Sequence, residues 1–150
     1  MGIDKDIHQI SFRNSYNKAM VNILFTNNWL LERIKSFVNA EDITPQQYNI
    51  LRILRGAGLP LSTLQIRERM LDKMSDTSRI VDRLITKGLV KKEISTKDRR
   101  LVDISITEPG TGLLAKLDAR ETELDNLLHN LNEDEAESLS KLLDKLRNHQ

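Results

Sequence analysis

Apolar residues recur at three- and four-residue spacing along the first forty residues of the chain. This is the period of an amphipathic α-helix, and it predicts a long helix over residues 6–39 that could break near Asn27-Asn28. The stripe is long for the core of a small domain, so it could equally cover a partner chain. Its members are Met20, Ile23, Leu24, Leu30, Leu31, Ile34, Phe37 and Val38.

Three shorter helices with strong start signals are predicted next. Thr44-Pro45-Gln46-Gln47 combines a capping residue, a proline suited to the first helical position and the glutamine of a capping box. Ser62-Thr63-Leu64-Gln65 is a second capping box, which opens a short helix. Ser75 is the expected cap of a third helix, which runs to Lys87 and stops at Gly88.

The period then changes to a two-residue alternation over Leu101–Ile106, which predicts a β-strand. Leu89–Ile94 is its expected antiparallel partner, although Lys91-Lys92-Glu93 breaks the alternation. Residues 95–100 would form a projecting loop between the strands. This loop carries three positive charges.

Two further helical segments follow the hairpin. Thr107 can cap the first, and Asn132 with Glu135 can start the last. The first carries a long stripe of leucines: Leu113, Leu114, Leu117, Leu124, Leu127, Leu128 and Leu131. The order helix, helix, helix, strand, loop, strand predicts a mainly α (α+β) fold, a winged helix-turn-helix with a two-stranded β-wing.

Composition removes several classes of function. The chain has no cysteine, which excludes disulfides, thiolate metal sites and thiol redox sensing. Its three histidines, His8, His129 and His149, have no metal-binding spacing. No apolar run approaches the roughly 20 residues of a membrane span. We therefore expect a cytoplasmic protein without a metal ion or cofactor.

Charge is distributed unevenly although the net charge is only +1. Residues 61–107 hold eleven basic and seven acidic groups, a balance of +4. Residues 108–150 hold five basic and ten acidic groups, a balance of −5. A basic middle and an acidic end favour one surface that meets polyanions, although chance variation of a mixed surface is the alternative.

The helix expected at residues 75–87 has an outer face suited to DNA. Arginine can bond guanine with two hydrogen bonds, serine can reach a base edge or a phosphate, and Asp76 could accept from cytosine. The candidates are Ser75, Asp76, Ser78, Arg79 and Arg83. The alternative is a solvated face with weak ion pairs, on which Asp76 only complements the helix N-terminus.

Residues 98–110 resemble the wing signature of the MarR family of transcriptional regulators, D-x-R-x-x-x-V-x-L-T-x-x-G. Asp98, Arg100, Thr107 and Gly110 match it, and two isoleucines replace its valine and leucine. Residues 78–90 resemble the recognition helix of the family and its exit. The acid at Asp76 departs from the small hydroxyl residues that are common there.

The resemblance implies a homodimer that binds a pseudo-palindromic operator and acts as a repressor. Residues 1–43 would be an N-terminal dimerisation helix, 44–107 the DNA-binding lobe and 108–150 C-terminal dimerisation helices. Arg100 would enter the minor groove, oriented by Asp98, although a purely loop-stabilising ion pair is the alternative. Lys97 or Arg99 would contact phosphate, as would Ser62 and Thr63, for which capping alone is an equal explanation.

The resemblance also implies a small aromatic or phenolic ligand. The candidate contacts are Arg13, Tyr16, Trp29, Phe37, Tyr48 and Arg52. Simple packing of these side chains is the alternative.

A winged-helix module that binds protein without specific DNA binding is the second functional hypothesis. An enzyme is disfavoured, because the sequence has no catalytic triad motif, glycine-rich phosphate loop or metal cluster.

Overall fold

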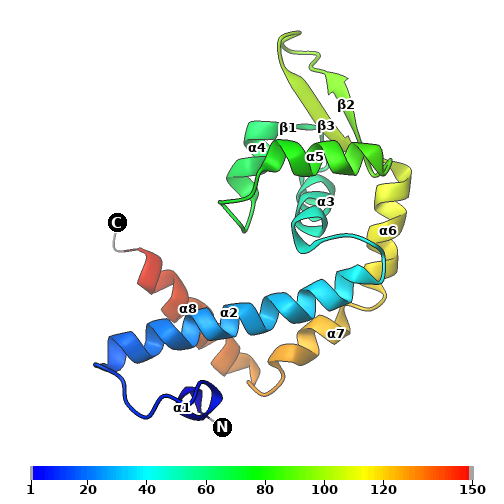
Figure 1. Cartoon of the computed structure of the whole chain (residues 1–150). Coiled ribbons are helices and arrows are strands. Elements are labelled where there is room, and N and C mark those ends of the chain that lie inside the picture. The colour runs from blue at the N-terminus through cyan, green and yellow to red at the C-terminus, as the bar shows by residue number, and fades with distance from the viewer. Residues whose placement is uncertain (1, 149–150) are drawn as a thin grey trace. The chain divides into compact units, whose positions relative to one another are not determined.

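The computed structural model describes residues 2–148 and divides into two compact units, residues 1–45 and 46–150 (Figure 1). The first unit holds the short helix α1 (Ile3–Asp6) and the long helix α2 (Ser15–Asn39). Asn14 caps α2 by accepting from the backbone N–H of Asn17 at 2.9 Å. The helix expected over residues 6–39 therefore begins later, and the break expected at Asn27-Asn28 is wrong, because α2 is continuous.

The apolar stripe of α2 stays accessible along much of its length. Met20, Ile23, Leu24 and Leu31 are all exposed in the chain as described. Exposing several large apolar side chains on one helix is unfavourable in water, because burying each methylene group stabilises the folded protein by about 0.8 kcal/mol. This exposure agrees with the sequence-based expectation that the stripe is too long for the core of one small domain.

The three predicted short helices come next in the chain. They are α3 (Pro45–Ala57), α4 (Thr63–Arg69) and α5 (Thr77–Thr86). The capping box at Ser62 is confirmed, because its hydroxyl accepts from the Gln65 N–H and the Gln65 side chain accepts from the Ser62 N–H. The cap expected at Ser75 is wrong, because the carboxylate of Asp76 caps α5 instead.

The end of α5 has the predicted left-handed stop. Gly88 has a φ of +75°, a conformation that favours glycine. The Leu89 N–H donates to the Leu84 carbonyl at 3.0 Å, and the Gly88 N–H donates to the Ile85 carbonyl at 2.9 Å. This is the Schellman pattern, and it turns the chain out of α5 directly into the hairpin.

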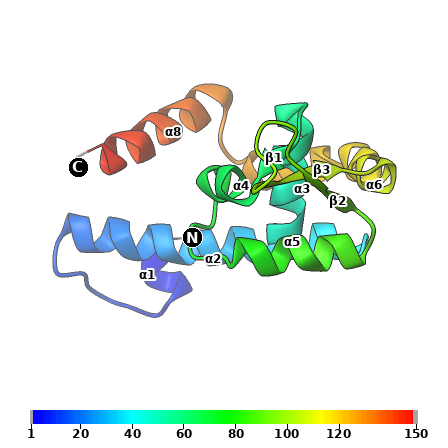
Figure 2. The ribbon, with the colours of Figure 1, turned by 90° about the horizontal axis from the view of Figure 1, so that it is seen from above.

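The wing is confirmed as an antiparallel hairpin of β2 (Val90–Ile94) and β3 (Val102–Ile106). A two-residue strand that the sequence did not predict, β1 (Leu61–Ser62), pairs with β3 on its other side. The described sheet therefore has the order β1-β3-β2. Ile104, in the central strand, is fully buried. In Figure 1 the β2–β3 hairpin projects from the rest of this unit, and Figure 2 shows the same lobe from above.

A junction at Thr107 joins the end of α5, the hairpin and the next helix, α6 (Glu108–Asp118). The Thr107 hydroxyl accepts from the Gly110 N–H at 3.2 Å and lies 2.6 Å from the Gly88 carbonyl, to which it donates. The Thr107 N–H donates to the Leu89 carbonyl at 3.0 Å. A Cβ on Gly110 would lie 2.3 Å from the Leu89 oxygen, so only glycine fits there.

Beyond α6 the chain does not form the long leucine helix that its stripe suggested. It breaks into α7 (Thr122–Asp125), a 3-10 turn (Asn126–Leu128) and α8 (Glu133–Arg147). Leu114 and Leu117, both in α6, are the members of the stripe that the described lobe buries fully. The capping box of Asn132 and Glu135 is confirmed at the start of α8. No residue of α8 is buried in the described chain.

An ion pair ties the end of α3 to the end of α6. The Arg55 guanidinium donates to both carboxylate oxygens of Asp118, at 2.6 and 3.1 Å. These hydrogen bonds lower the pKa of the Asp118 carboxyl and raise that of Arg55.

None of the helices in the part of the chain that is described is long and apolar enough to cross a membrane.

The Thr107 junction predicts opposite effects of two neighbouring glycine substitutions. Gly110→Ala should lower the free energy of unfolding by about 1–3 kcal/mol, because the new methyl group meets a backbone carbonyl. Gly112→Ala is the matched control in the same helix, where a Cβ meets nothing within 4 Å. It should stabilise by about 0.5–1 kcal/mol. Urea unfolding measures both, and equal shifts would contradict the junction.

Candidate nucleic-acid interface

Helix α5 presents one buried and one exposed face. Thr77, Val81 and Leu84 are buried and anchor the helix in the lobe. Ser78, Arg79, Asp82 and Arg83 are exposed on its outer side. The three outer candidates named from the sequence, Ser78, Arg79 and Arg83, are therefore available to a ligand. Ser75 differs from them, because its hydroxyl is buried and has no hydrogen-bond partner among the described residues.

Asp76 occupies the anion-binding position at the start of α5. Its carboxylate accepts from the Arg79 N–H at 3.2 Å and pairs with the Arg79 Nε at 3.4 Å. Backbone N–H groups at a helix N-terminus attract anions, and here an internal carboxylate already satisfies one of them. Asp76 also holds the Arg79 side chain beside the helix start.

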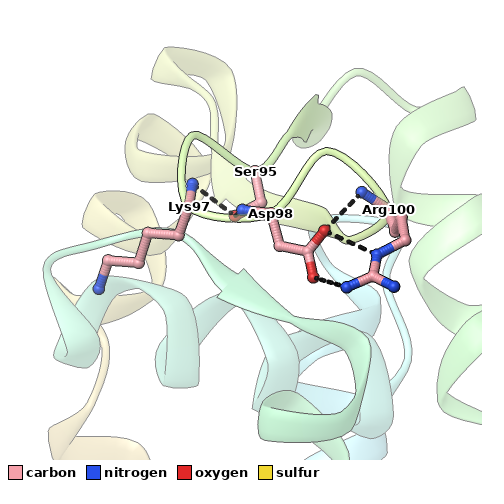
Figure 3. A network of polar contacts seen from close by, with 4 residues as sticks. All are labelled: Ser95, Lys97, Asp98 and Arg100. Atoms are coloured by element: carbon pink, nitrogen blue, oxygen red, sulfur yellow. Dashed lines mark hydrogen bonds and ion pairs between the residues drawn. The ribbon is translucent and has the colours of Figure 1, made fainter.

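The wing loop is organised by Ser95, which the sequence did not single out. Ser95 is buried, and its hydroxyl accepts from the N–H groups of Lys97 at 3.2 Å and Asp98 at 3.4 Å. The Ser95 N–H donates to the Leu101 carbonyl, and the Leu101 N–H donates to the Asp98 carbonyl. Figure 3 shows Ser95 beside Lys97 and Asp98 in this loop.

Asp98 holds Arg100 through three hydrogen bonds. Its carboxylate accepts from the Arg100 N–H at 3.0 Å, from Nε at 3.1 Å and from one terminal nitrogen at 3.2 Å (Figure 3). The Arg100 side chain nevertheless stays 89% exposed. The loop therefore displays a guanidinium whose direction is fixed by a carboxylate from the same turn.

The contacts from Arg100 also set the charge of Asp98. The side-chain hydrogen bonds, and then the backbone one, lower the pKa of the Asp98 carboxyl below its ordinary value of 3.8. A carboxyl with a lowered pKa keeps its stabilising contact above its ordinary pKa and loses it as the pH falls through the lowered value. The pair is therefore intact at neutral pH.

An ion pair between α5 and the wing was also missed by sequence reasoning. The Lys92 ammonium on β2 donates to an Asp82 carboxylate oxygen on α5 at 3.1 Å. From the sequence, Lys92 resembles any solvated strand residue, because its partner Asp82 lies ten positions earlier in another element. The contact links the two elements that carry most of the candidate DNA-binding residues.

The remaining sequence candidates lie at the start of α4 and in two separate sets. Ser62 and Thr63 are half-buried where α4 begins. Four ligand candidates, Arg13, Tyr16, Trp29 and Phe37, belong to the first unit, whereas Tyr48 and Arg52 belong to α3. The Arg52 guanidinium lies 5.5 Å from the centre of the Tyr48 ring. In the first unit, Arg33, which the sequence did not single out, lies 4.2 Å from the Trp29 ring.

Comparison with known proteins supports the fold and the family. The sequence profile of the MarR family matches residues 41–101. Over 70 residues, 47% of this chain, the sequence is 39% identical to the HTH-type transcriptional repressor MdtR of Bacillus subtilis, of which it covers 44%. This central part of the chain is therefore similar to the MarR family.

Solved structures show that the family fold extends over most of the chain. A mutant MarR from E. coli complexed with operator DNA has a TM-score of 0.76 at 23% identity, covering 83% of this chain and 90% of that one. The organohalide-sensing regulator RdhR, in its 2,4-dichlorophenol-bound form, has a TM-score of 0.79 at 19% identity, covering 95% and 88%. MdtR and RdhR are both named as transcriptional regulators.

The wing geometry predicts a measurable pKa. Arg100→Gln should return the pKa of the Asp98 carboxyl most of the way to 3.8, because the side-chain hydrogen bonds are lost while the backbone N–H remains. Arg99→Gln, at the adjacent position, should leave it lowered. Carboxyl chemical shifts followed by NMR measure both variants. An ordinary Asp98 pKa in the unaltered protein would show that the pair does not form in solution.

Proposed function

We propose that this chain is a homodimeric transcriptional regulator that binds double-stranded DNA. Helix α5 would lie in the major groove and the wing would reach the neighbouring minor groove. The observation that carries the proposal is the exposed Arg100 guanidinium, held by Asp98 at the end of a hairpin that Lys92 and Asp82 tie to α5. A narrow minor groove concentrates negative potential and attracts an inserted arginine.

Each candidate has a distinct proposed contact. Ser78, Arg79 and Arg83 would meet base edges, and Asp76 would accept from cytosine while it keeps Arg79 in place. Lys97 and Arg99 would contact phosphates on either side of the minor groove. Ser62 and Thr63, at the start of α4, would contact the backbone of the same DNA, and Ser75 would do so only if its covered hydroxyl turned outward.

The homodimer is supported by apolar surface on the terminal helices. Besides the stripe of α2, the leucines Leu139, Leu142 and Leu146 are exposed on α8. Such stripes on helices from both chain ends would bury each other in a two-fold pair. Two recognition helices would then meet half-sites about one helical turn apart.

We also propose repression and relief by a small aromatic or phenolic ligand. MdtR is named as a repressor, and RdhR was solved with a dichlorophenol. In this chain Tyr48, Arg52, Trp29, Phe37, Tyr16 and Arg13 are the candidate contacts. A DNA-binding role would place the protein in the bacterial or archaeal cytoplasm, at the nucleoid.

DNA binding is tested with the fragment upstream of the gene that encodes this chain, against a scrambled fragment, between roughly 50 and 200 mM salt. We expect a preference for the upstream fragment that persists at the higher salt. Arg100→Ala should weaken binding and reduce the preference for A·T-rich flanks, whereas Arg100→Lys, which keeps the charge, should recover only part. Weak binding to both fragments that vanishes with salt would favour a protein-binding module instead.

Dimerisation is tested by placing a charge on the leucine face of α8. Leu142→Glu should give a monomer by light scattering, with at least a tenfold loss of operator affinity, because two half-sites no longer bind together. The lobe should stay folded, since α8 buries no residue in the described chain. Ser140→Glu, exposed on the same helix but off the leucine face, is the control. A monomeric Leu142→Glu protein with full affinity would refute the dimer.

A further inference from the structure

The end of the wing carries aliphatic side chains that the lobe does not cover. Ile94 is 69% exposed, Leu101 52% and Val102 42%. We call these three residues the wing-tip patch. Ile94 ends β2, Val102 begins β3, and the two are direct cross-strand partners. Ile94 and Val102 therefore lie side by side at the far end of the hairpin, and Leu101 directly precedes Val102.

Two members of the patch share a hairpin face with Lys92. Side chains alternate along a strand, so Ile94 and Lys92 project to the same face, as do their cross-strand partners Val102 and Ile104. At its base this face buries Val90, and halfway along it Ile104 is buried while its partner Lys92 binds Asp82 of α5. The apolar pair thus continues the face that is turned towards α5, beyond the point where the core ends.

Folding of the hairpin does not explain these side chains. The core beneath it is already filled by Val90 and Ile104, both buried. Native proteins usually protect an edge strand and its end with polar or charged residues, because exposed apolar strands invite aggregation. Here Lys91, Lys92 and Glu93 follow that pattern along β2, and Ile94 departs from it at the position nearest the loop.

We propose that the wing-tip patch packs against deoxyribose rings in the walls of the minor groove, beside the inserted Arg100. This inference rests on the proposed function and adds an apolar contact to its polar ones. A groove wall alternates apolar sugar faces with anionic phosphates. The wing tip has a complementary composition, since the loop that joins Ile94 to Leu101 and Val102 contains Lys97, Arg99 and Arg100. Apolar side chains are a recurring part of minor-groove binding surfaces.

The double variant Ile94→Thr with Val102→Thr tests the contact and keeps both residues β-branched, as strands favour. We expect affinity for the upstream fragment to fall roughly five- to tenfold, since two apolar side-chain ends leave the contact. The slope of log affinity against log salt should not change, because no phosphate contact is lost. Lys97→Ala is the contrast, and should lower that slope by about one.

Three controls separate the contact from a damaged wing. Leu59→Thr alters an equally exposed apolar residue in the turn before β1 and should leave affinity unchanged. The double variant should unfold at nearly the temperature of the unaltered protein. It should also keep the lowered pKa of Asp98, which shows that the loop still holds Arg100.

Three results would overturn the inference, and two of them leave the proposed function intact. If the unaltered protein prefers the upstream fragment and the double variant binds it equally well, the patch does not touch DNA. If the unaltered protein shows no such preference, the proposed function itself fails, and the patch then fits a protein partner. A loss of affinity with a reduced salt slope would assign the effect to phosphate contacts and would also reject the apolar contact.

Discussion

The hydroxyl of Thr107 is the contact on which the lobe depends most. The hydroxyl caps α6 and donates to the Gly88 carbonyl at the end of α5. The backbone N–H of the same threonine donates to the Leu89 carbonyl. These hydrogen bonds therefore fix α5, the hairpin and α6 relative to one another. Gly110 allows this approach because no Cβ stands between α6 and the Leu89 carbonyl. The T-x-x-G end of the family signature thus has a structural cause that is independent of DNA.

The face proposed to bind DNA is built from cations that carboxylates already hold. Arg79 is paired with Asp76, Lys92 with Asp82 and Arg100 with Asp98. All three pairs are largely exposed, and such pairs contribute only about 0–1 kcal/mol to stability. Their main effect is on geometry, because a tethered guanidinium loses less conformational freedom when it meets a base or a groove. The same carboxylates reduce the general attraction to DNA and so favour sites that offer more than phosphates.

Local signals in the sequence were sufficient for the elements of the lobe and insufficient for the contacts between them. Ser62 with Gln65, Gly88 and the alternation over β3 are short-range patterns, and each was confirmed. The sequence favours Ser75 as a cap because serine is a strong capping residue, but Asp76 competes for the same position and has the charge that a helix start favours. The leucine stripe up to Leu131 suggested a single helix. The spacing of leucines does not reveal the turns that separate α6, α7 and the 3-10 turn.

The contacts that the sequence did not predict join residues far apart in the chain or depend on a buried hydroxyl. Lys92 and Asp82 lie in different elements, as do Arg55 and Asp118, so no spacing rule brings them together. Ser95 resembles any loop serine until its burial is known. The wing-tip patch was not predicted either. Ile94 and Val102 lie in the two predicted strands, and nothing in the strand pattern shows that the lobe leaves their side chains exposed.

A net charge of +1 is compatible with DNA binding because electrostatic attraction acts over short distances. At physiological ionic strength the Debye length is about 8 Å, so charges more distant from a phosphate are largely screened. The +4 balance of residues 61–107 governs the field at α5 and the wing, whereas the −5 balance resides in the α6–α8 segment. An acidic segment away from the groove then limits the total charge of the chain while the local field of the binding face remains positive.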